Sequence, residues 1–306
     1  MESLAPIAFF VFRRPEHTKK VLDSLMTNSL LCESVLYVFC EAPRSIDDQD
    51  LVDRTRELVR TYAQAKQVHI IERSTNMGCA NSIISGINCV LEQFDRVIVL
   101  EDDVVVSRYF LDYMNQALSR YSNERRVMHI SAYNFPVEAS TNQGSAFLPM
   151  ISSWGWGTWR RAWSLFDADL SALPWLNKRT WRRFRFDLYG AYRYYKMLLQ
   201  CRDREIDAWD IRWYLTVFRH SGLGLFPCAS LTANIGFDET ATHFTDPRFT
   251  QSVAEVADAR VNSWPTFIRI NWTEFHRTVQ FLSFGRPWRT RISELIRTQL
   301  GLRVQQ

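Results

Sequence analysis

The chain has 306 residues, of which 46% are hydrophobic and 23% charged, which suffices for one large domain or two closely joined ones. No stretch reaches the roughly 20 apolar residues that a membrane-spanning helix needs. The six cysteines form no C-x-x-C pair of the kind found in zinc sites. We therefore expect a soluble, cytoplasmic protein without a structural zinc.

The charges divide the chain near residue 150. Residues 1–150 carry 15 basic and 19 acidic side chains, whereas residues 151–306 carry 22 basic and 14 acidic ones. All eleven tryptophans lie in the second half, starting at Trp154. A basic, tryptophan-rich half could suit nucleic acid, an anionic membrane surface or phosphate-bearing sugars. Alternatively, most of its tryptophans could simply fill a helical core.

The first hundred residues alternate between two kinds of segment. Short apolar runs rich in β-branched and aromatic residues predict buried strands at 7–12, 35–39, 68–71 and 97–100. Segments of helical period predict helices at 16–26, 50–65 and 79–94. This alternation predicts an α/β fold with a mainly parallel sheet.

Helices are predicted to dominate the rest of the chain. We expect further strands at 127–132, 146–150 and 223–226, and helices at 109–121, 179–204, 207–220, 267–281 and 292–302. No low-complexity linker is visible, so the halves are expected to pack as one compact unit.

Three adjacent acids follow the predicted strand at 97–100, namely Glu101, Asp102 and Asp103. Adjacent carboxylates repel one another, and such a cluster becomes favourable when a hard cation neutralises it. Mg²⁺ or Mn²⁺ is commonly held by one or two carboxylates together with substrate phosphates. A solvated acidic turn is the alternative, but the apolar runs on both sides of the triplet favour the metal.

Four motifs occur in an order that resembles GT-A fold glycosyltransferases. They are Arg13-Arg14-Pro15-Glu16-His17, Cys40-Glu41-Ala42-Pro43-Arg44, Asn76-Met77-Gly78 and Glu101-Asp102-Asp103. The sequence is most similar to the bacterial family 2-like sugar transferases, and more distantly to the N-acetylglucosaminyltransferase I group. The resemblance covers about residues 5–245. It implies a Rossmann-like sheet flanked by helices, a UDP-sugar donor, and Mn²⁺ or Mg²⁺.

The resemblance also implies roles for individual residues near the donor. Asp103 would bind the metal, while Asp102 and Glu101 would serve the ribose and the donor sugar. Arg14 matches an arginine near the nucleotide, although it could instead be a surface residue beside a helix start. Glu41 falls where many relatives carry an aspartate that recognises uracil.

A second motif, Asp207-Ala-Trp209-Asp210-Ile-Arg212-Trp213, resembles the segment that supplies the catalytic base in the N-acetylglucosaminyltransferase I group. An inverting transfer needs one carboxylate to take the proton of the acceptor hydroxyl. Asp210 is the expected base, and Asp207, three residues earlier, is the alternative. Both could also be ordinary acids at the start of a helix.

Two further segments could complete the pocket. His243 lies in a stretch that resembles the family's closing loop, and it could contact the metal or the diphosphate, or be an ordinary surface histidine. The glycine-rich run from Trp154 to Trp159 could bring backbone and flat rings close to a sugar. We expect Trp154 at the ligand. The run could instead form a core wedge between the sheet and the helices, which Trp159 and Trp163, four apart on a helix, would fit better than Trp154 or Trp156.

The predicted helix at 179–204 interleaves arginines with aromatic residues. It could rest on an anionic membrane surface that holds lipid-linked acceptors, or its basic residues could form a solvated face over a core.

Two rival functions have weaker sequence support. A sugar nucleotidyltransferase would carry a glycine-rich loop after the first strand, where this chain has Phe12-Arg13-Arg14-Pro15. A non-catalytic glycan- or nucleotide-binding module would not need the acidic triplet, and no nucleic-acid-binding motif is present.

We therefore expect a metal-dependent, inverting glycosyltransferase of surface polysaccharide synthesis, with a carbohydrate or lipid-linked glycan acceptor. It would be cytoplasmic and would touch the inner face of the membrane peripherally. Residues 1–150 would bind the donor, 151–245 would hold the acceptor and the base, and 246–306 would form a helical extension.

Overall fold

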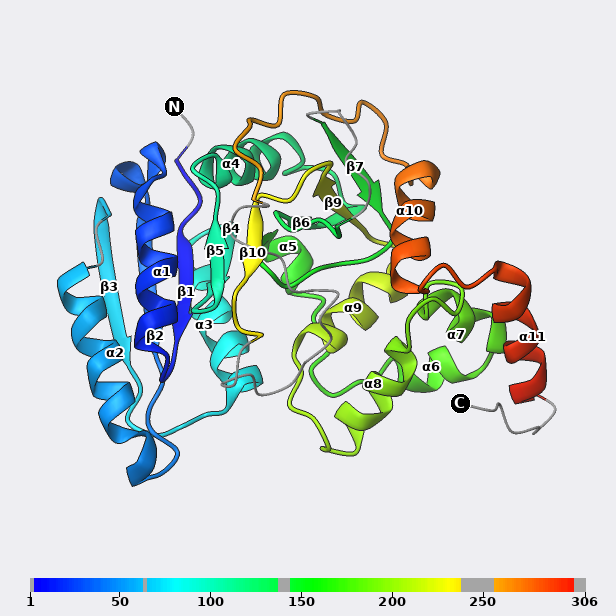
Figure 1. Cartoon of the computed structure of the whole chain (residues 1–306), viewed down its shortest axis with the longest axis horizontal. Helices are drawn as coiled ribbons and strands as arrows, with labels where there is room; N and C mark the ends of the chain where they lie inside the picture. The colour runs from blue at the N-terminus through cyan, green and yellow to red at the C-terminus, as the bar shows by residue number, and fades with distance from the viewer. Residues whose placement is uncertain (1–2, 63–64, 137–143, 238–255, 300–306) are drawn as a thin grey trace.

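The computed structural model describes residues 3–62, 65–136, 144–237 and 256–299. Its centre is an eight-stranded sheet with helices packed around it (Figure 1). In spatial order the strands are β3 (Gln67–Glu72), β2 (Val35–Cys40), β1 (Ile7–Val11), β4 (Arg96–Glu101), β8 (Trp156–Trp159), β6 (Val127–Ser131), β9 (Leu223–Pro227) and β7 (Ser145–Leu148).

The sheet is parallel over its first four strands, from β3 to β4, and again between β6 and β9. Strand β8 is antiparallel to both of its neighbours, β4 and β6, and β7 is antiparallel to β9. A separate antiparallel pair joins β5 (Val104–Val106) to β10 (Thr232–Asn234). The predicted α/β fold with a mostly parallel, Rossmann-like sheet is confirmed.

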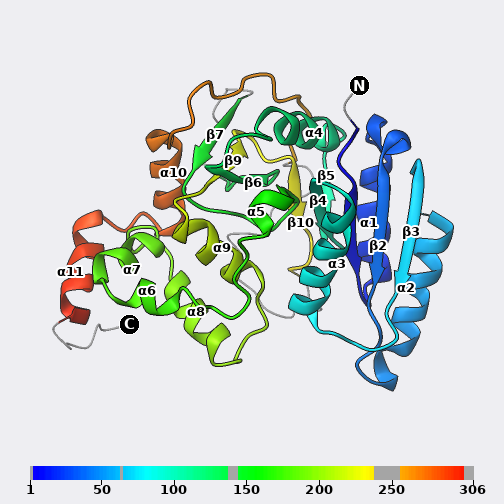
Figure 2. The same cartoon turned by 180° about the vertical axis from the view of Figure 1, so that it is seen from behind.

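Helices lie around the sheet and to one side of it, and Figure 2 shows them from behind. They are α1 (Pro15–Met26), α2 (Gln49–Tyr62), α3 (Cys79–Gln93), α4 (Phe110–Arg120), α5 (Arg160–Trp163), α6 (Leu173–Asn177), α7 (Thr180–Phe186), α8 (Tyr194–Arg202), α9 (Asp210–Arg219), α10 (Trp272–Leu282) and α11 (Trp288–Gln299). None of the described helices is long and apolar enough to cross a membrane.

The buried strands divide their side chains between two cores because successive residues of a strand point to opposite faces. In β1, Ile7 and Phe9 pack in the core beneath α1 and α4, whereas Ala8 and Phe10 pack in the core beneath α3 and α9. Both faces of the strand are therefore apolar, which is why it appears in the sequence as one continuous hydrophobic run.

Two predictions about the second half are wrong. The single helix expected at 179–204 is divided into α7 and α8, because Leu188 and Tyr189 adopt positive φ angles of 48° and 58° that a right-handed helix cannot contain. Trp159 does not share a helix with Trp163, since it ends strand β8 and α5 begins at the next residue.

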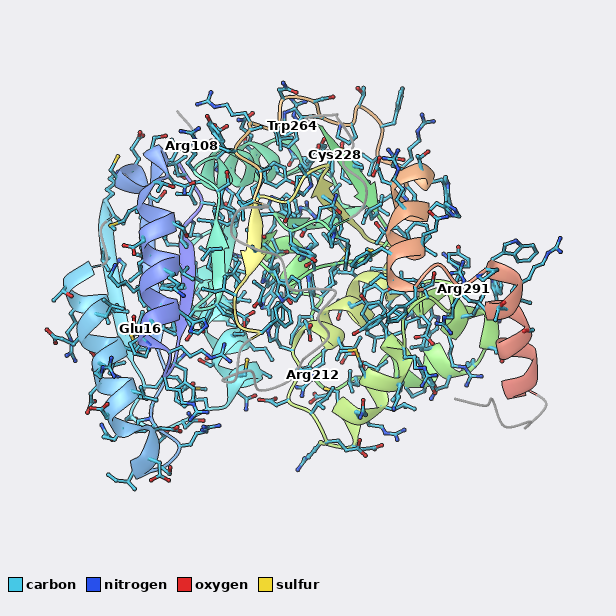
Figure 3. The ribbon with its side chains drawn as sticks, viewed as in Figure 1. Glu16, Arg108, Arg212, Cys228, Trp264 and Arg291 are labelled. Carbon is cyan, nitrogen blue, oxygen red and sulfur yellow. The ribbon has the colours of Figure 1, made fainter. Side chains whose placement is uncertain are left out.

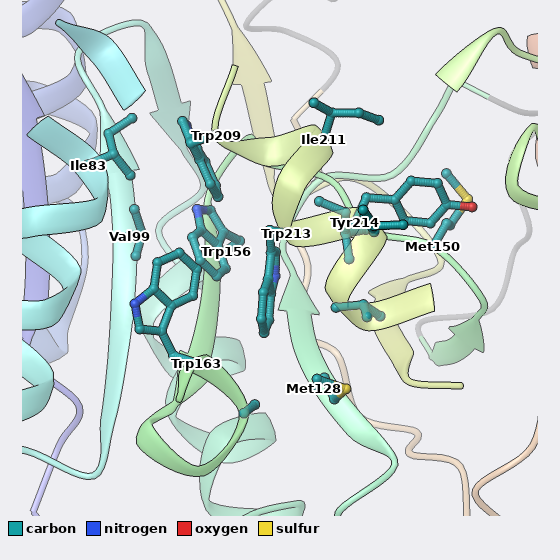
Figure 4. Close-up of a cluster of buried hydrophobic side chains, with 14 of the residues drawn as sticks. Ile83, Val99, Met128, Met150, Trp156, Trp163, Trp209, Ile211, Trp213 and Tyr214 are labelled. Carbon is teal, nitrogen blue, oxygen red and sulfur yellow. The ribbon is translucent and has the colours of Figure 1, made fainter. Parts of the chain in front are cut away.

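Trp156 is a core residue, which is the alternative that the sequence left open for this run. It is fully buried, stacks on Trp209 with ring centroids 5.0 Å apart, and lies 5.9 Å from the ring of Trp163. Figure 4 shows these rings gathered with Trp213 between β8 and α9. Much of the tryptophan enrichment of the second half therefore builds the core under the pocket.

His129 is buried within this tryptophan cluster. Its ring stacks on Trp156 at 5.1 Å, its Nδ1 accepts from the indole N–H of Trp213 at 3.3 Å, and its Nε2 lies 2.9 Å from the carbonyl oxygen of Ser152. An indole N–H can only donate, so Nδ1 carries the lone pair and Nε2–H donates to Ser152. Burial lowers the pKa of His129 to about 3.

This depressed pKa predicts that acid weakens the fold. Between pH 6.5 and 3 the unfolded chain binds a proton at His129 that the folded chain does not, so stability falls as the pH falls. We expect His129 alone to remove about 2 kcal/mol of unfolding free energy between pH 7 and pH 5. Urea denaturation of wild type and His129→Gln at both pH values measures this, and equal losses in the two proteins would contradict it.

Candidate active site

A cavity of about 570 Å³ lies at the carboxyl ends of the parallel strands. The ends of β1, β2 and β4 supply its polar wall, and the start of α9 closes the opposite side. Every described residue predicted for the site lines this cavity: Arg14, Glu41, Glu101, Asp102, Asp103, Trp154, Asp207 and Asp210. Residues from position 14 to position 210 of the sequence are thus brought to one place.

The acidic triplet is tied to the end of β1. Asp102 is buried, and its Oδ2 accepts from the backbone N–H of Phe12 at 3.1 Å. Arg14 Nη1 lies 3.0 Å from Asp103 Oδ2, and both side chains are largely shielded from water. This ion pair offsets one of the three adjacent negative charges.

The remaining charges of the triplet still repel one another. Burial, and then the neighbouring Asp103, raise the pKa of Asp102 to about 7. Burial raises the pKa of Glu101 well above its usual range, and Asp103 and Asp210 add to the rise. Burial also raises the pKa of Asp103, although Arg14 opposes that rise. Such a cluster of buried carboxylates favours a cation.

The second pair of predicted acids lies at the start of α9. Asp207 precedes that helix, and its Oδ2 accepts from the backbone N–H of Ala80 at the start of α3, at 3.1 Å. Asp210 is the first residue of α9, and its charge contributes to the raised pKa of Glu101. Asp207 therefore holds two segments together, whereas the negative charge of Asp210 acts on the acidic triplet.

Gly236 approaches the carboxylate of Asp103 closely. Strand β10 pairs with β5, and just beyond it the N–H of Ile235 donates to the carbonyl oxygen of Asp103 at 2.8 Å. A Cβ placed on Gly236 would lie only 2.3 Å from Asp103 Oδ2. Only glycine leaves Asp103 where it is, and the sequence did not indicate this requirement.

Glu41 follows β2 and is buried in the cavity wall. Its Oε1 accepts from the backbone N–H of Ala42 at 2.9 Å, while its Oε2 is buried with no hydrogen-bond partner among the described residues. A buried oxygen without a donor is costly. Glu41 lines the cavity, so a rotation of its carboxylate would bring this unmatched acceptor to a ligand N–H.

The far end of the cavity has an apolar wall that the sequence did not reveal. Trp154 meets the rings of Tyr133 and Phe237 edge-on at 4.5 and 5.5 Å. The wall continues through Phe135, Met150, Ile151, Tyr192, Tyr194, Met197, Ile206 and Leu282. In the sequence, buried aliphatic and aromatic residues of this kind look the same whether they line a cavity or fill a core.

The acids present fit a cation shared with a ligand better than a closed metal cage. Within the described part of the chain, no three His, Cys, Asp or Glu side chains are gathered closely enough to enclose a metal by themselves. Mg²⁺ and Mn²⁺ sites that are completed by substrate phosphates need only one or two carboxylates. Asp103, with Asp102 beside it, meets that requirement. His243 lies outside the described residues.

Part of the chain is similar to a known family. Residues 45–144, a third of the chain, match the family model Glycosyl transferase family 2, and this stretch contains the acidic triplet. The chain resembles a family 2 glycosyltransferase. The resemblance expected from the sequence is thereby confirmed, and the match supports a glycosyltransferase over a nucleotidyltransferase. Arg14 and Asp210 lie outside the matched stretch.

Two solved structures are similar at low scores. The mannosyltransferase PcManGT from Pyrobaculum calidifontis, in complex with GDP-Man and Mn²⁺, is 12% identical over 71% of this chain and 70% of its own, with a TM-score of 0.35. A cytidylyltransferase from Leptospira borgpetersenii serovar Hardjo-bovis is 11% identical over 72% and 94%, also with a TM-score of 0.35. Neither likeness is close enough to carry an argument. A comparison with curated proteins finds no match.

Proposed function

We propose that the chain transfers a sugar, with inversion, from a nucleoside diphosphate donor to a carbohydrate acceptor. The observation that carries the proposal is that the acidic triplet, Arg14 and Asp210 line one cavity at the carboxyl ends of the parallel strands. Open α/β sheets bind their ligands at this edge. The donor would lie over residues 1–150, and the acceptor against residues 151–245.

The polar wall would hold the donor. Glu41 would accept a ring N–H of the base, and Asp102 and Glu101 would contact the ribose and the donor sugar. Asp103 would hold Mn²⁺ or Mg²⁺, which when bound neutralises charge on the leaving diphosphate. Arg14, already paired with Asp103 at 3.0 Å, would add a second positive charge beside that diphosphate.

Asp210 would act as the base. It would take the proton of the acceptor hydroxyl while that oxygen forms a bond to the anomeric carbon, and the diphosphate would leave from the opposite face with the bonding electron pair. We prefer Asp210 to Asp207 because the hydrogen bond of Asp207 ties it to another segment at Ala80. The hydrogen bond of Asp210 is to its neighbour Ile211, and its charge acts on Glu101.

UDP is the donor nucleotide that the resemblance implies, and Glu41 fits it because uracil offers a ring N–H to a carboxylate acceptor, as thymine and guanine also do and cytosine does not. Glu41→Gln replaces that acceptor with an N–H₂ donor. We expect the Kd for UDP to rise about 10- to 100-fold and the preference over CDP to shrink or reverse. Calorimetric titration of both nucleotides measures this, with the exposed Glu92→Gln as control. Unchanged UDP affinity in Glu41→Gln would contradict the assignment.

Release of the nucleoside diphosphate from a panel of donors tests the proposed function. UDP-, GDP- and dTDP-sugars are incubated with the protein and Mn²⁺, with and without oligosaccharide acceptors. We expect release from one nucleotide class, loss of release with a chelator, and no release by Asp103→Ala. Binding without release from any donor would favour a non-catalytic module.

The acceptor pathway follows from the resemblance and from the apolar wall. We propose a glycan of a bacterial surface polysaccharide, carried on a lipid, as the acceptor. A product analysis that found the sugar on a protein or on a small molecule would overturn this part of the proposal.

A further inference from the structure

Two segments far apart in the sequence carry large aromatic side chains exposed to water. Trp181 lies on α7 and is 56% exposed, while Phe284 and Trp288, where α10 leads into α11, are 68% and 60% exposed. Large aromatic side chains gathered on a surface mark an interaction site more often than a free face. We call residues 178–186 and 283–291 together the aromatic–basic surface.

The charge of the aromatic–basic surface has one sign. Neither segment contains an aspartate or a glutamate, and together they contain eight basic residues: Lys178, Arg179, Arg182, Arg183, Arg185, Arg286, Arg289 and Arg291. Some of these are used inside the protein, since Arg182 lies over the ring of Trp175 and Arg291 is buried. Lys178, Arg179, Arg185 and Arg289 are exposed. The partner should therefore be anionic.

The loop between α7 and α8 joins the two segments. Trp181 packs edge-on against Tyr189, with ring centroids 5.9 Å apart. Arg291 donates to the carbonyl oxygen of Tyr189 at 3.1 Å, and Arg286 donates to that of Gly190 at 3.4 Å. Figures 1 and 2 show α7 and α11 at the same end of the molecule, and Figure 3 places Arg291 at that junction.

This surface adjoins the apolar end of the cavity. Leu282 lines the cavity two residues before the exposed Phe284, and Tyr192 lines it two residues after Gly190. The nearby cavity wall includes Met197, which offers hydrocarbon contacts rather than hydrogen bonds. A polyanion such as nucleic acid would account for the arginines, but an apolar wall beside them fits a lipid better.

We propose that the aromatic–basic surface docks on an anionic lipid bilayer. Trp181, Phe284 and Trp288 would enter the boundary between headgroups and acyl chains, as aromatic side chains do at membrane interfaces. The exposed arginines and lysine would lie at the negative headgroups. The apolar end of the cavity would then open beside the membrane. This docking does not depend on the proposed sugar transfer.

Flotation of the protein with lipid vesicles tests the proposal. Vesicles of phosphatidylcholine with about one third phosphatidylglycerol are compared with phosphatidylcholine alone, at low and high salt. We expect wild type to bind the anionic vesicles at least tenfold more strongly. We expect two variants, Trp181→Ala/Phe284→Ala/Trp288→Ala and Arg179→Glu/Arg289→Glu, each to lose about tenfold or more of that binding.

Two control variants remove similar side chains elsewhere. Phe267→Ala deletes an equally exposed aromatic, and Arg125→Glu reverses an exposed charge, so both should bind vesicles as wild type does. Thermal unfolding with and without nucleotide, measured on each protein, checks the fold and the donor site separately. If nucleotide does not raise the Tm of wild type but wild type still binds anionic vesicles, the proposed function is contradicted and the docking proposal is not.

Three outcomes would overturn the docking proposal. Wild type could bind neutral and anionic vesicles equally, or not at all. The two surface variants could bind as well as the controls. Finally, wild type could bind a single-stranded oligonucleotide but no vesicles, and the two surface variants could lose the oligonucleotide binding. That result would assign the surface to nucleic acid.

Discussion

Asp210→Asn is expected to slow sugar transfer by about 10²- to 10⁴-fold, the usual contribution of a general base. The amide keeps the size of the side chain, and its oxygen can still accept from the N–H of Ile211, as Asp210 Oδ1 does at 2.8 Å. Donor binding should therefore change little. Steady-state kinetics, with a separate titration of donor affinity, measure the two effects.

Asp207→Asn is the matched control for this prediction. Its amide oxygen can replace the carboxylate oxygen that accepts from Ala80, so the start of α3 should stay in place. We expect Asp207→Asn to retain most of the transfer rate. If Asp207→Asn abolished transfer while Asp210→Asn did not, the base would be Asp207.

Gly236→Ala is expected to raise the Kd of the donor about 10- to 100-fold in the presence of metal. The added Cβ would lie 2.3 Å from Asp103 Oδ2 and 3.0 Å from Asp103 Cγ, so the carboxylate must move. Forcing a methyl group into a filled site costs about 1 to 3 kcal/mol. Calorimetric titration of the donor with Mn²⁺ measures the loss.

Gly285→Ala provides the comparison, because an added Cβ there meets nothing within 4 Å. The φ angle of 68° at Gly285 should cost some stability, but donor affinity should stay at the wild-type value. If Gly236→Ala bound the donor as tightly as Gly285→Ala does, the position of Asp103 would not matter for the donor.

The donor half of the fold could be predicted because its signals are local. Strands such as β1 and β4 are buried on both faces, so their apolar runs stand out, and parallel strands bring their carboxyl ends to one edge. The acidic triplet stood out because it follows such a strand, whereas Arg14 and Glu41 were predicted from the family resemblance. The roles of these residues remain proposals.

The second half could not be predicted as well because its structure depends on distant contacts. Strand β8 lies between β4 and β6, although it follows both of them in the sequence. Nothing in Trp156-Gly-Thr-Trp159 indicates that these two strands are its neighbours. The break between α7 and α8 is held by Arg286 and Arg291, a hundred residues away. The clash that requires Gly236 is likewise visible only once β10 is paired with β5.

Thermal unfolding with Mn²⁺ and nucleotides tests the central claim most directly, namely that the acidic triplet binds a metal together with a nucleoside diphosphate. A ligand that binds only the folded chain must raise its Tm. At a hundred times its Kd, UDP with Mn²⁺ should raise the Tm by about 5 °C or more, and Asp103→Ala should lose this response. If no nucleotide shifts the wild type at millimolar concentration with Mn²⁺, or if Asp103→Ala responds equally, the claim is contradicted.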